Sequence, residues 1–201
     1  MKRILVLTFL FLTAAVHAQT PSPAATATAT ATATPASTPA APPAADFTDK
    51  EFPSVKATLA IPKGWFFFEL KSTDLGASYL ITKEKVESEY DSFKTGMTLN
   101  IIRGQNGYKP SEFAKSLIEQ SQEKDENSKI ETSDEPPYKV YKTTQTIETD
   151  EGKLVMLTLF KANDKSGTLY HFTWQYPQKE EAQALPLWNE MLKRIKIDPA
   201  F

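Results

Sequence analysis

The feature that most constrains this chain is a stretch of 27 residues, 19–45, that contains only Gln, Thr, Pro, Ser and Ala. It has no charged, aromatic or large aliphatic side chain, so nothing in it offsets the entropy cost of ordering the backbone. Its prolines favour extended conformations. We therefore predict a disordered tether over 19–45, with an O-glycosylated or wall-spanning spacer as the alternative. A folded core is expected only in residues 46–201.

The residues before the tether have the pattern of a secretory signal peptide. Two of the first three residues are basic, Ile4–Val16 is almost wholly apolar, and small residues occupy positions 16 and 18. This apolar run is shorter than the roughly twenty residues that a membrane-spanning helix needs. We predict a signal peptide over 1–18, cleavage after Ala18, a periplasmic or secreted protein, and no integral membrane span. An uncleaved anchor is the alternative.

Charge and cysteine content exclude several classes of function. Cleavage after Ala18 leaves 21 basic and 25 acidic side chains, with the basic ones scattered among the acids, so no nucleic-acid partner is expected. The chain has no cysteine. This absence excludes disulfides, a cysteine-linked lipid anchor, thiol catalysis and the usual Cys/His zinc sites.

Hydrophobic periodicity from residue 46 onward predicts one α+β domain without internal repeats. Alternation of apolar and polar residues predicts strands, short turns between them predict antiparallel pairing, and apolar residues at helical spacing predict two amphipathic helices. Pro186 is expected either to begin the second helix or to kink it. The fold class is an antiparallel sheet of about six to seven strands flanked by helices. The predicted strands are 55–61, 65–70, 77–82, 97–103, 138–148, 154–161 and 168–176, and the predicted helices are 110–124 and 185–195.

No familiar catalytic pattern can be assembled from these residues. The seven glycines stand apart, which excludes a phosphate loop and a dinucleotide fingerprint. His171, the one histidine left after cleavage, lies in a predicted strand with Leu169 and Thr173 on its face, and no Gly-x-Ser-x-Gly elbow is present. A structural strand histidine is expected, with a catalytic His171 as the alternative. We predict no catalytic, metal-binding or cofactor-binding residue.

Acidic side chains cluster in segments that are predicted to be loops. Paired carboxylates can serve as a general acid and base, or bind calcium, when their environments differ. Here they are interleaved with lysines, so solvated acids are expected, with a calcium site or a carboxylate-dependent hydrolase as alternatives. The clusters are Glu84, Glu87, Glu89 and Asp91; Asp125 and Glu126; Asp134 and Glu135; and Asp150 and Glu151.

Aromatic residues are the most distinctive feature of the domain. Trp65–Phe68 is a run of four aromatics, and four more alternate along the predicted strand that ends at Tyr176. Alternating aromatics on a strand usually form a core beneath a helix. The alternative is an aromatic platform for a sugar or an apolar ligand. The candidate ligand or partner surface consists of Trp65, Phe67, Trp174 and Tyr176.

The order of the elements carries a resemblance to a known family. A first strand runs through Ile61-Pro62-Lys63-Gly64-Trp65 into the next strand, a helix begins at Pro110, and a closing helix around Trp188 leads into Ile195-Lys196-Ile197. This order, over roughly residues 50–198, resembles PsbP-like domains, the Mog1/PsbP fold. The resemblance implies an αβα sandwich and a non-enzymatic, accessory role, and no metal site carries over residue by residue.

These observations together suggest three functions. The leading hypothesis is an exported, non-catalytic accessory or binding domain of the cell envelope, with a protein partner. The second is a carrier of a sugar or lipid that uses an aromatic-lined pocket. The third is a carboxylate-dependent hydrolase. The sequence does not predict an oligomeric state.

Overall fold

The computed structural model describes residues 46–73, 76–88, 91–104, 107–124 and 128–201. They all belong to one compact unit that spans Ala41–Phe201. The predicted signal peptide and tether lie outside the described residues, so both remain predictions. No helix in the described ranges is long and apolar enough to span a membrane.

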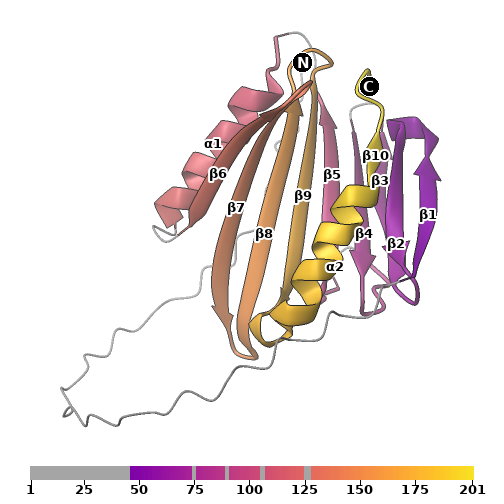
Figure 1. The fold of residues 1–201 in the computed structure, drawn as a ribbon, viewed down its shortest axis with the longest axis vertical. Helices are drawn as coiled ribbons and strands as arrows, with labels where there is room; N and C mark the ends of the chain where they lie inside the picture. Colours follow the sequence, from indigo (N-terminus) through magenta and orange to yellow (C-terminus); the bar gives the residue numbers. More distant parts are fainter. Residues whose placement is uncertain (1–45, 74–75, 89–90, 105–106, 125–127) are drawn as a thin grey trace, which may run out of the picture. The chain divides into compact units, whose positions relative to one another are not determined.

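A seven-stranded sheet forms the centre of the domain (Figure 1). Every pair of neighbouring strands in it is antiparallel, which confirms the predicted pairing. In spatial order the strands are β3 (Phe66–Thr73), β4 (Gly76–Thr82), β5 (Gly96–Arg103), β9 (Thr168–Pro177), β8 (Gly152–Asn163), β7 (Tyr138–Thr149) and β6 (Lys129–Glu135).

A small second sheet contains β1 (Phe47–Phe52), β2 (Ala57–Pro62) and β10 (Lys196–Ile197). The predicted turn after β2 lets the chain leave this sheet and enter the larger one. Gly64 has a φ of 83°, which favours glycine, and the Trp65 N–H donates to the Pro62 carbonyl at 3.0 Å. The predicted first strand is thus confirmed, but its partners form a separate sheet.

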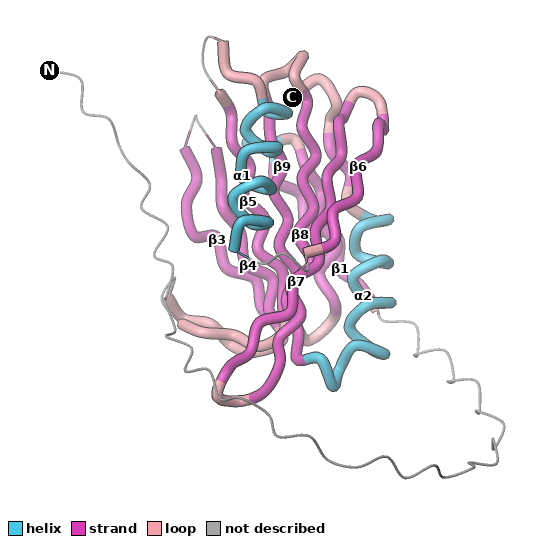
Figure 2. The backbone as a smooth tube through the Cα atoms, turned by 90° about the vertical axis from the view of Figure 1, so that its left-hand side faces the viewer, coloured by secondary structure: helices cyan, strands magenta, loops and turns pink. Residues whose placement is uncertain are grey.

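The two helices lie on opposite faces of the large sheet, which confirms the αβα arrangement. Helix α1 (Pro110–Lys124) packs on β7, β8 and β9, and helix α2 (Glu181–Arg194) packs on β9 and on β2 (Figures 1 and 2). Helix α2 begins after a 3-10 turn, Gln178–Glu180. Pro186 therefore lies inside the helix, and the prediction that it begins the helix is wrong. Because proline has no backbone N–H, the second turn of α2 lacks one backbone hydrogen bond.

Each face of the sheet has its own core, because side chains alternate between the faces along every strand. The larger core lies toward α2 and the small sheet, and contains Trp174, Phe172, Leu59 and Met191. The smaller core lies beneath α1; its buried members are Ala114, Ile118, Phe160, Ala162 and Leu169.

Sequence periodicity missed β1, β6 and β10. The side chains of β1 and β6 are mostly exposed, so neither strand has the alternation that marks a half-buried strand. Strand β10 has only two residues. All three are edge strands, held by pairing with a neighbour rather than by burial of one face.

Candidate functional site

Helix α2 leaves an open groove beside it on the larger-core side of the sheet. Helix α2 covers β9. On this side of the sheet no helix lies above β6, β7 or the part of β8 next to β7 (Figure 1). Two adjoining hollows of about 130 Å³ and 340 Å³ follow the helix, and Lys142, Leu159 and Leu192 line both. We call these two hollows together the α2 groove.

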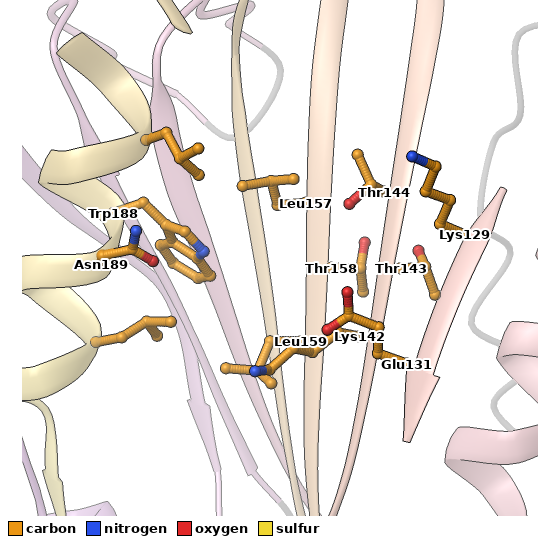
Figure 3. Close-up of a pocket in the computed structure, with 12 residues that line it drawn as sticks. Lys129, Glu131, Lys142, Thr143, Thr144, Leu157, Thr158, Leu159, Trp188 and Asn189 are labelled. Atoms are coloured by element: carbon orange, nitrogen blue, oxygen red, sulfur yellow. The ribbon is translucent and has the colours of Figure 1, made fainter. Parts of the chain in front are cut away.

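The α2 groove has apolar surfaces on both the strand side and the helix side. On the strands, Leu157 and Leu159 of β8 lie beside Phe172 of β9. Figure 3 shows Trp188 and Asn189 of α2 facing the strands across the first hollow. The remaining apolar lining residues are Tyr138, Leu185, Leu192, Ile195 and Ile197.

The charged residues of the groove are mostly basic. Its lining includes four lysines against two glutamates, a local net charge of +2 in a chain whose net charge is −2. Lys161 pairs with Glu135 at 3.0 Å and Lys193 lies 3.9 Å from Glu190 of its own helix. The other two lysines, Lys129 and Lys142, form no salt bridge with any residue that the structure describes.

The strand register places three of these lysines on one diagonal. Lys129 on β6 is paired with Thr144 of β7, two residues from Lys142. Lys142 in turn is paired with Leu159 of β8, two residues from Lys161. From one lysine to the next, the diagonal crosses to the adjacent strand and shifts by two residues along it. The Cα atoms of successive lysines are therefore about 8 Å apart. Glu131, which is paired with Lys142, lies beside this row.

The aromatic surface predicted from the sequence is instead a buried stack. Trp174 is 0% exposed and Tyr176 is 2% exposed, so these two residues belong to the core, and their prediction as surface residues is corrected. Trp65 and Phe67 are half-buried and pack against the same core. All four residues lie on the face that α2 and the small sheet cover, which is why their rings are removed from water.

The stack links the core to the groove. Trp65 and Trp174 lie 5.6 Å apart with rings 5° from parallel, and Trp174 and Trp188 lie 5.6 Å apart at 21°. These three are the only tryptophans of the chain. Trp188 is 5% exposed and belongs both to the stack and to the lining of the groove, so we expect a ligand in the groove to change the intrinsic fluorescence of the protein.

His171 faces α1, on the side of the sheet opposite the α2 groove. Its ring stacks on Phe160 at 4.4 Å, and its Nε2 lies 3.1 Å from the hydroxyl of Thr173, the predicted neighbour on its face. Burial lowers the pKa of His171 to about 4. No carboxylate contributes to this shift, so the orienting acid of a catalytic triad is not beside it.

Several members of the acidic clusters make local contacts in the described residues, among them Glu84, Asp91 and Glu151. Asp91 accepts hydrogen bonds from the backbone N–H groups of Glu87 and Ser88, and these bonds lower its pKa. The Lys94 ammonium lowers the pKa of Glu151. A general acid would need a raised pKa instead. Glu89, Asp125 and Glu126 lie outside the described residues.

No group of three or more histidine, aspartate or glutamate side chains in the part of the chain that the structure describes could hold a metal ion.

Sequence reasoning missed the groove lysines and one exposed aromatic. The lysines lie far apart in the sequence, and only the strand register brings them together. Phe66, in the aromatic run that supplied Trp65 and Phe67, is 41% exposed because it points to the other face of β3. Alternation alone indicates that Phe66 and Phe67 face opposite ways, but not which face is covered.

Comparison with known proteins identifies the fold. Cyanobacterial PsbP (CyanoP) from Synechocystis sp. PCC 6803 matches with a TM-score of 0.52 and 10% identity, over 77% of this chain and 94% of that one. The Ran-binding protein Mog1p of Saccharomyces cerevisiae matches with a TM-score of 0.46 and 12% identity, over 77% and 96%. No protein-family model matches the chain, and no curated protein matches its sequence. The domain has a PsbP/Mog1-like fold, as its element order predicted.

Proposed function

We propose that this chain is an exported, non-catalytic binding domain of the cell envelope, whose α2 groove holds an extended acidic segment of a partner protein. The observation that carries the proposal is the diagonal of Lys129, Lys142 and Lys161 beside an apolar helix wall. A positive groove on a negatively charged protein attracts an acidic partner and disfavours a basic one.

The spacing of the lysines fits an extended peptide. In an extended chain, alternate side chains point the same way and lie about 7 Å apart, close to the roughly 8 Å between neighbouring lysines on the diagonal. Acidic residues at every second position can therefore each meet one lysine. The side chains between them then face the apolar residues of α2, among them Trp188 and Leu192.

The form of the groove favours a peptide over a small carried ligand. A carrier needs a deep pocket that buries most of its ligand. The two hollows beside α2 are open to solvent and follow the helix, and the rings of Trp174 and Tyr176 are packed in the core. An extended peptide that lies along α2 fits these hollows better than a compact sugar or lipid.

Export is part of the proposal and has its own test. The basic start, short apolar run and small residues at positions 16 and 18 support cleavage after Ala18. The protein purified from the periplasm or medium of a secreting host should begin at Gln19 by N-terminal sequencing. If the protein stays in the cytosol with its first residues intact, the proposed envelope location is wrong.

The groove is tested by titrating the full chain with a peptide of alternating threonine and glutamate. Binding is measured by tryptophan fluorescence and by calorimetry. We expect an emission change, because Trp188 lines the groove, and binding that weakens with salt. Lys142→Glu should weaken binding at least about tenfold, as expected for reversing one charge at close range. Lys165→Glu is the matched control, since Lys165 is an exposed lysine in the β8–β9 turn, outside the groove.

Two results would contradict the proposal that the groove binds an acidic segment. One is equal binding of the peptide in which every glutamate is replaced by glutamine. The other is an equal loss of affinity in Lys142→Glu and Lys165→Glu, which would show a response to net charge rather than to the groove.

A further inference from the structure

The two hollows of the α2 groove differ in the residues that line them. The lining of the first hollow includes three threonines, Thr143, Thr144 and Thr158. The second hollow, of about 340 Å³, has no uncharged polar residue other than Tyr138 in its lining. Its apolar and aromatic residues are Tyr138, Leu159, Phe172, Leu192, Ile195 and Ile197, and its other four residues are all charged. The larger hollow thus combines an apolar surface with charge.

The apolar surface of the second hollow comes from the sheet on one side and from the end of α2 on the other. Leu159 of β8 and Phe172 of β9 are paired in the strand register and are both buried. Ile195 follows the last residue of α2, and Ile197 lies in β10, directly after it (Figure 1). Both isoleucines are half-buried, so each keeps apolar surface that a ligand can remove from water.

Basic side chains stand on both sides of this apolar surface. Lys142 and Lys161 belong to the strands, Lys193 belongs to α2, and Glu135 is the one acid in the lining of the second hollow. The local net charge is therefore +2, against +1 for the two lysines and one glutamate of the first hollow. A ligand that fits the second hollow combines an apolar group with negative charge around it.

The acids already beside these lysines hold them weakly. The side chains of the Lys161–Glu135 pair are 28% and 47% exposed, and those of the Lys193–Glu190 pair are 75% and 40% exposed. Ion pairs as exposed as these contribute little free energy. A carboxylate of a ligand can therefore approach Lys161 or Lys193 without breaking a strong internal contact.

The helix side of the groove changes along the path of an extended segment. If two acids of the segment meet Lys142 and Lys161, the residue between them points the other way, because side chains alternate along an extended chain. On the helix side of the second hollow, this residue meets Ile195 and Ile197. Beside the first hollow, the corresponding residue meets the exposed Asn189.

We infer that the bound segment carries a large apolar residue, such as leucine, between the two acids that meet Lys142 and Lys161, and that the second hollow binds this side chain. The inference rests on the proposed function and specifies its ligand as an acid–apolar–acid sequence. A segment of alternating acids alone can shift by two residues along the lysine diagonal and still pair its charges. One apolar residue in the second hollow fixes a single register.

The experiment titrates the full chain by calorimetry with the threonine–glutamate peptide and with the same peptide in which one central threonine is replaced by leucine. The leucine peptide should bind about tenfold more tightly, the order expected when a leucine side chain is largely removed from water. A third peptide carries the leucine at its first position, next to a single glutamate. Its affinity should increase less, because a leucine in the second hollow then has an acid on only one side.

Ile197→Thr tests the protein side of the contact. It removes apolar surface from the second hollow without changing any charge, so it should abolish most of the advantage of the leucine peptide. The affinity for the threonine–glutamate peptide should change little. Ile195→Thr is a second test variant with the same expectation, and thermal unfolding checks that each variant is folded.

Ile147→Thr is the matched control. Ile147 is 42% exposed and lies on β7, five residues from Lys142, so it points to the opposite face of the sheet. The control should keep the full advantage of the leucine peptide.

The outcomes separate this inference from the proposed function. A tighter leucine peptide whose advantage is lost in the two test variants and kept in Ile147→Thr supports the inference. If the threonine–glutamate peptide binds but central leucine brings no advantage, the inference is wrong and the acidic segment stands. An advantage that persists in both folded test variants, or that is equal for leucine at either position, also overturns the inference alone. If neither peptide binds, the inference and the proposed function are both wrong.

Discussion

The two faces of the seven-stranded sheet differ in both their cores and their open surfaces. The face toward α2 buries large rings, Trp174 and Phe172, and where it is uncovered it carries lysines and glutamates. The face toward α1 has a smaller core around Phe160, and where it is uncovered its hydrogen-bonding groups are mostly neutral hydroxyls and amides.

This difference shows how one sheet can offer two chemistries. Neighbouring residues of a strand point to opposite faces, so a single strand contributes to both surfaces without conflict. Thr173 and Trp174 of β9 are adjacent in sequence, yet Thr173 points toward the α1 side and Trp174 lies in the main core.

The largest expected effect compares these two adjacent residues. Trp174→Ala should lower the free energy of unfolding by about 3–5 kcal/mol, because it leaves a cavity between Trp65 and Trp188. Thr173→Ala should cost less than about 1 kcal/mol, since its side chain is only half-buried. Denaturant unfolding of both variants checks this, and equal losses would show that the two faces do not differ in packing as described.

The next effect concerns proton uptake by His171. The folded pKa of His171 is about 4, below the ordinary value of 6.5. The unfolded chain therefore takes up this proton first as the pH falls, and the stabilisation that is complete above pH 6.5 is lost between pH 6.5 and pH 4. At about pH 5 the loss attributable to His171 should be about 2 kcal/mol.

The measurement is the unfolding free energy at neutral pH and near pH 5, for the unchanged chain and for His171→Phe. The phenylalanine keeps a ring against Phe160 but cannot be protonated. We expect a smaller decrease in the variant. An equal decrease in both proteins would assign the pH dependence to the carboxylates instead.

A matched pair of substitutions tests whether peptide binding is confined to the groove. Thr144→Glu puts a negative charge beside Lys142 in the groove strands, and Thr98→Glu puts the same charge on the opposite face of the sheet. Thr144→Glu should weaken binding of the glutamate peptide about tenfold, near 1.4 kcal/mol, and Thr98→Glu should leave it nearly unchanged. Calorimetry with the glutamate peptide measures both affinities. Equal effects of the two variants would show a response to net charge rather than to the groove.

The smallest expected effect separates binding from stability within the groove. Lys161→Gln removes the partner of Glu135, a pair whose side chains remain 28% and 47% exposed. Partly exposed ion pairs contribute little, so the unfolding free energy should change by less than about 1 kcal/mol. Affinity for the glutamate peptide should nevertheless fall, because one lysine of the diagonal is lost. A large loss of stability would make Lys161 a structural residue rather than a binding residue.

Periodicity predicted most of the fold but little of the site. The strands that bury one face, such as β5 and β9, and the helix α1 were found because burial leaves a pattern in the sequence. The exposed edge strand β6 left no such pattern, although it supplies Lys129 and Glu131 to the groove. The predicted aromatic surface pointed to residues that are covered, because the sequence does not show which face a helix will occupy.

The sequence by itself determined an α+β domain after residue 45, antiparallel pairing and the absence of cysteine chemistry, because these depend on composition, short connections and local periodicity. Only the tertiary structure decided that Trp174 is core and Phe66 is exposed, and that three distant lysines form a diagonal. The physical reason is that these properties depend on strand register and on which face each helix covers. Both are set by long-range packing, which no local stretch of sequence specifies.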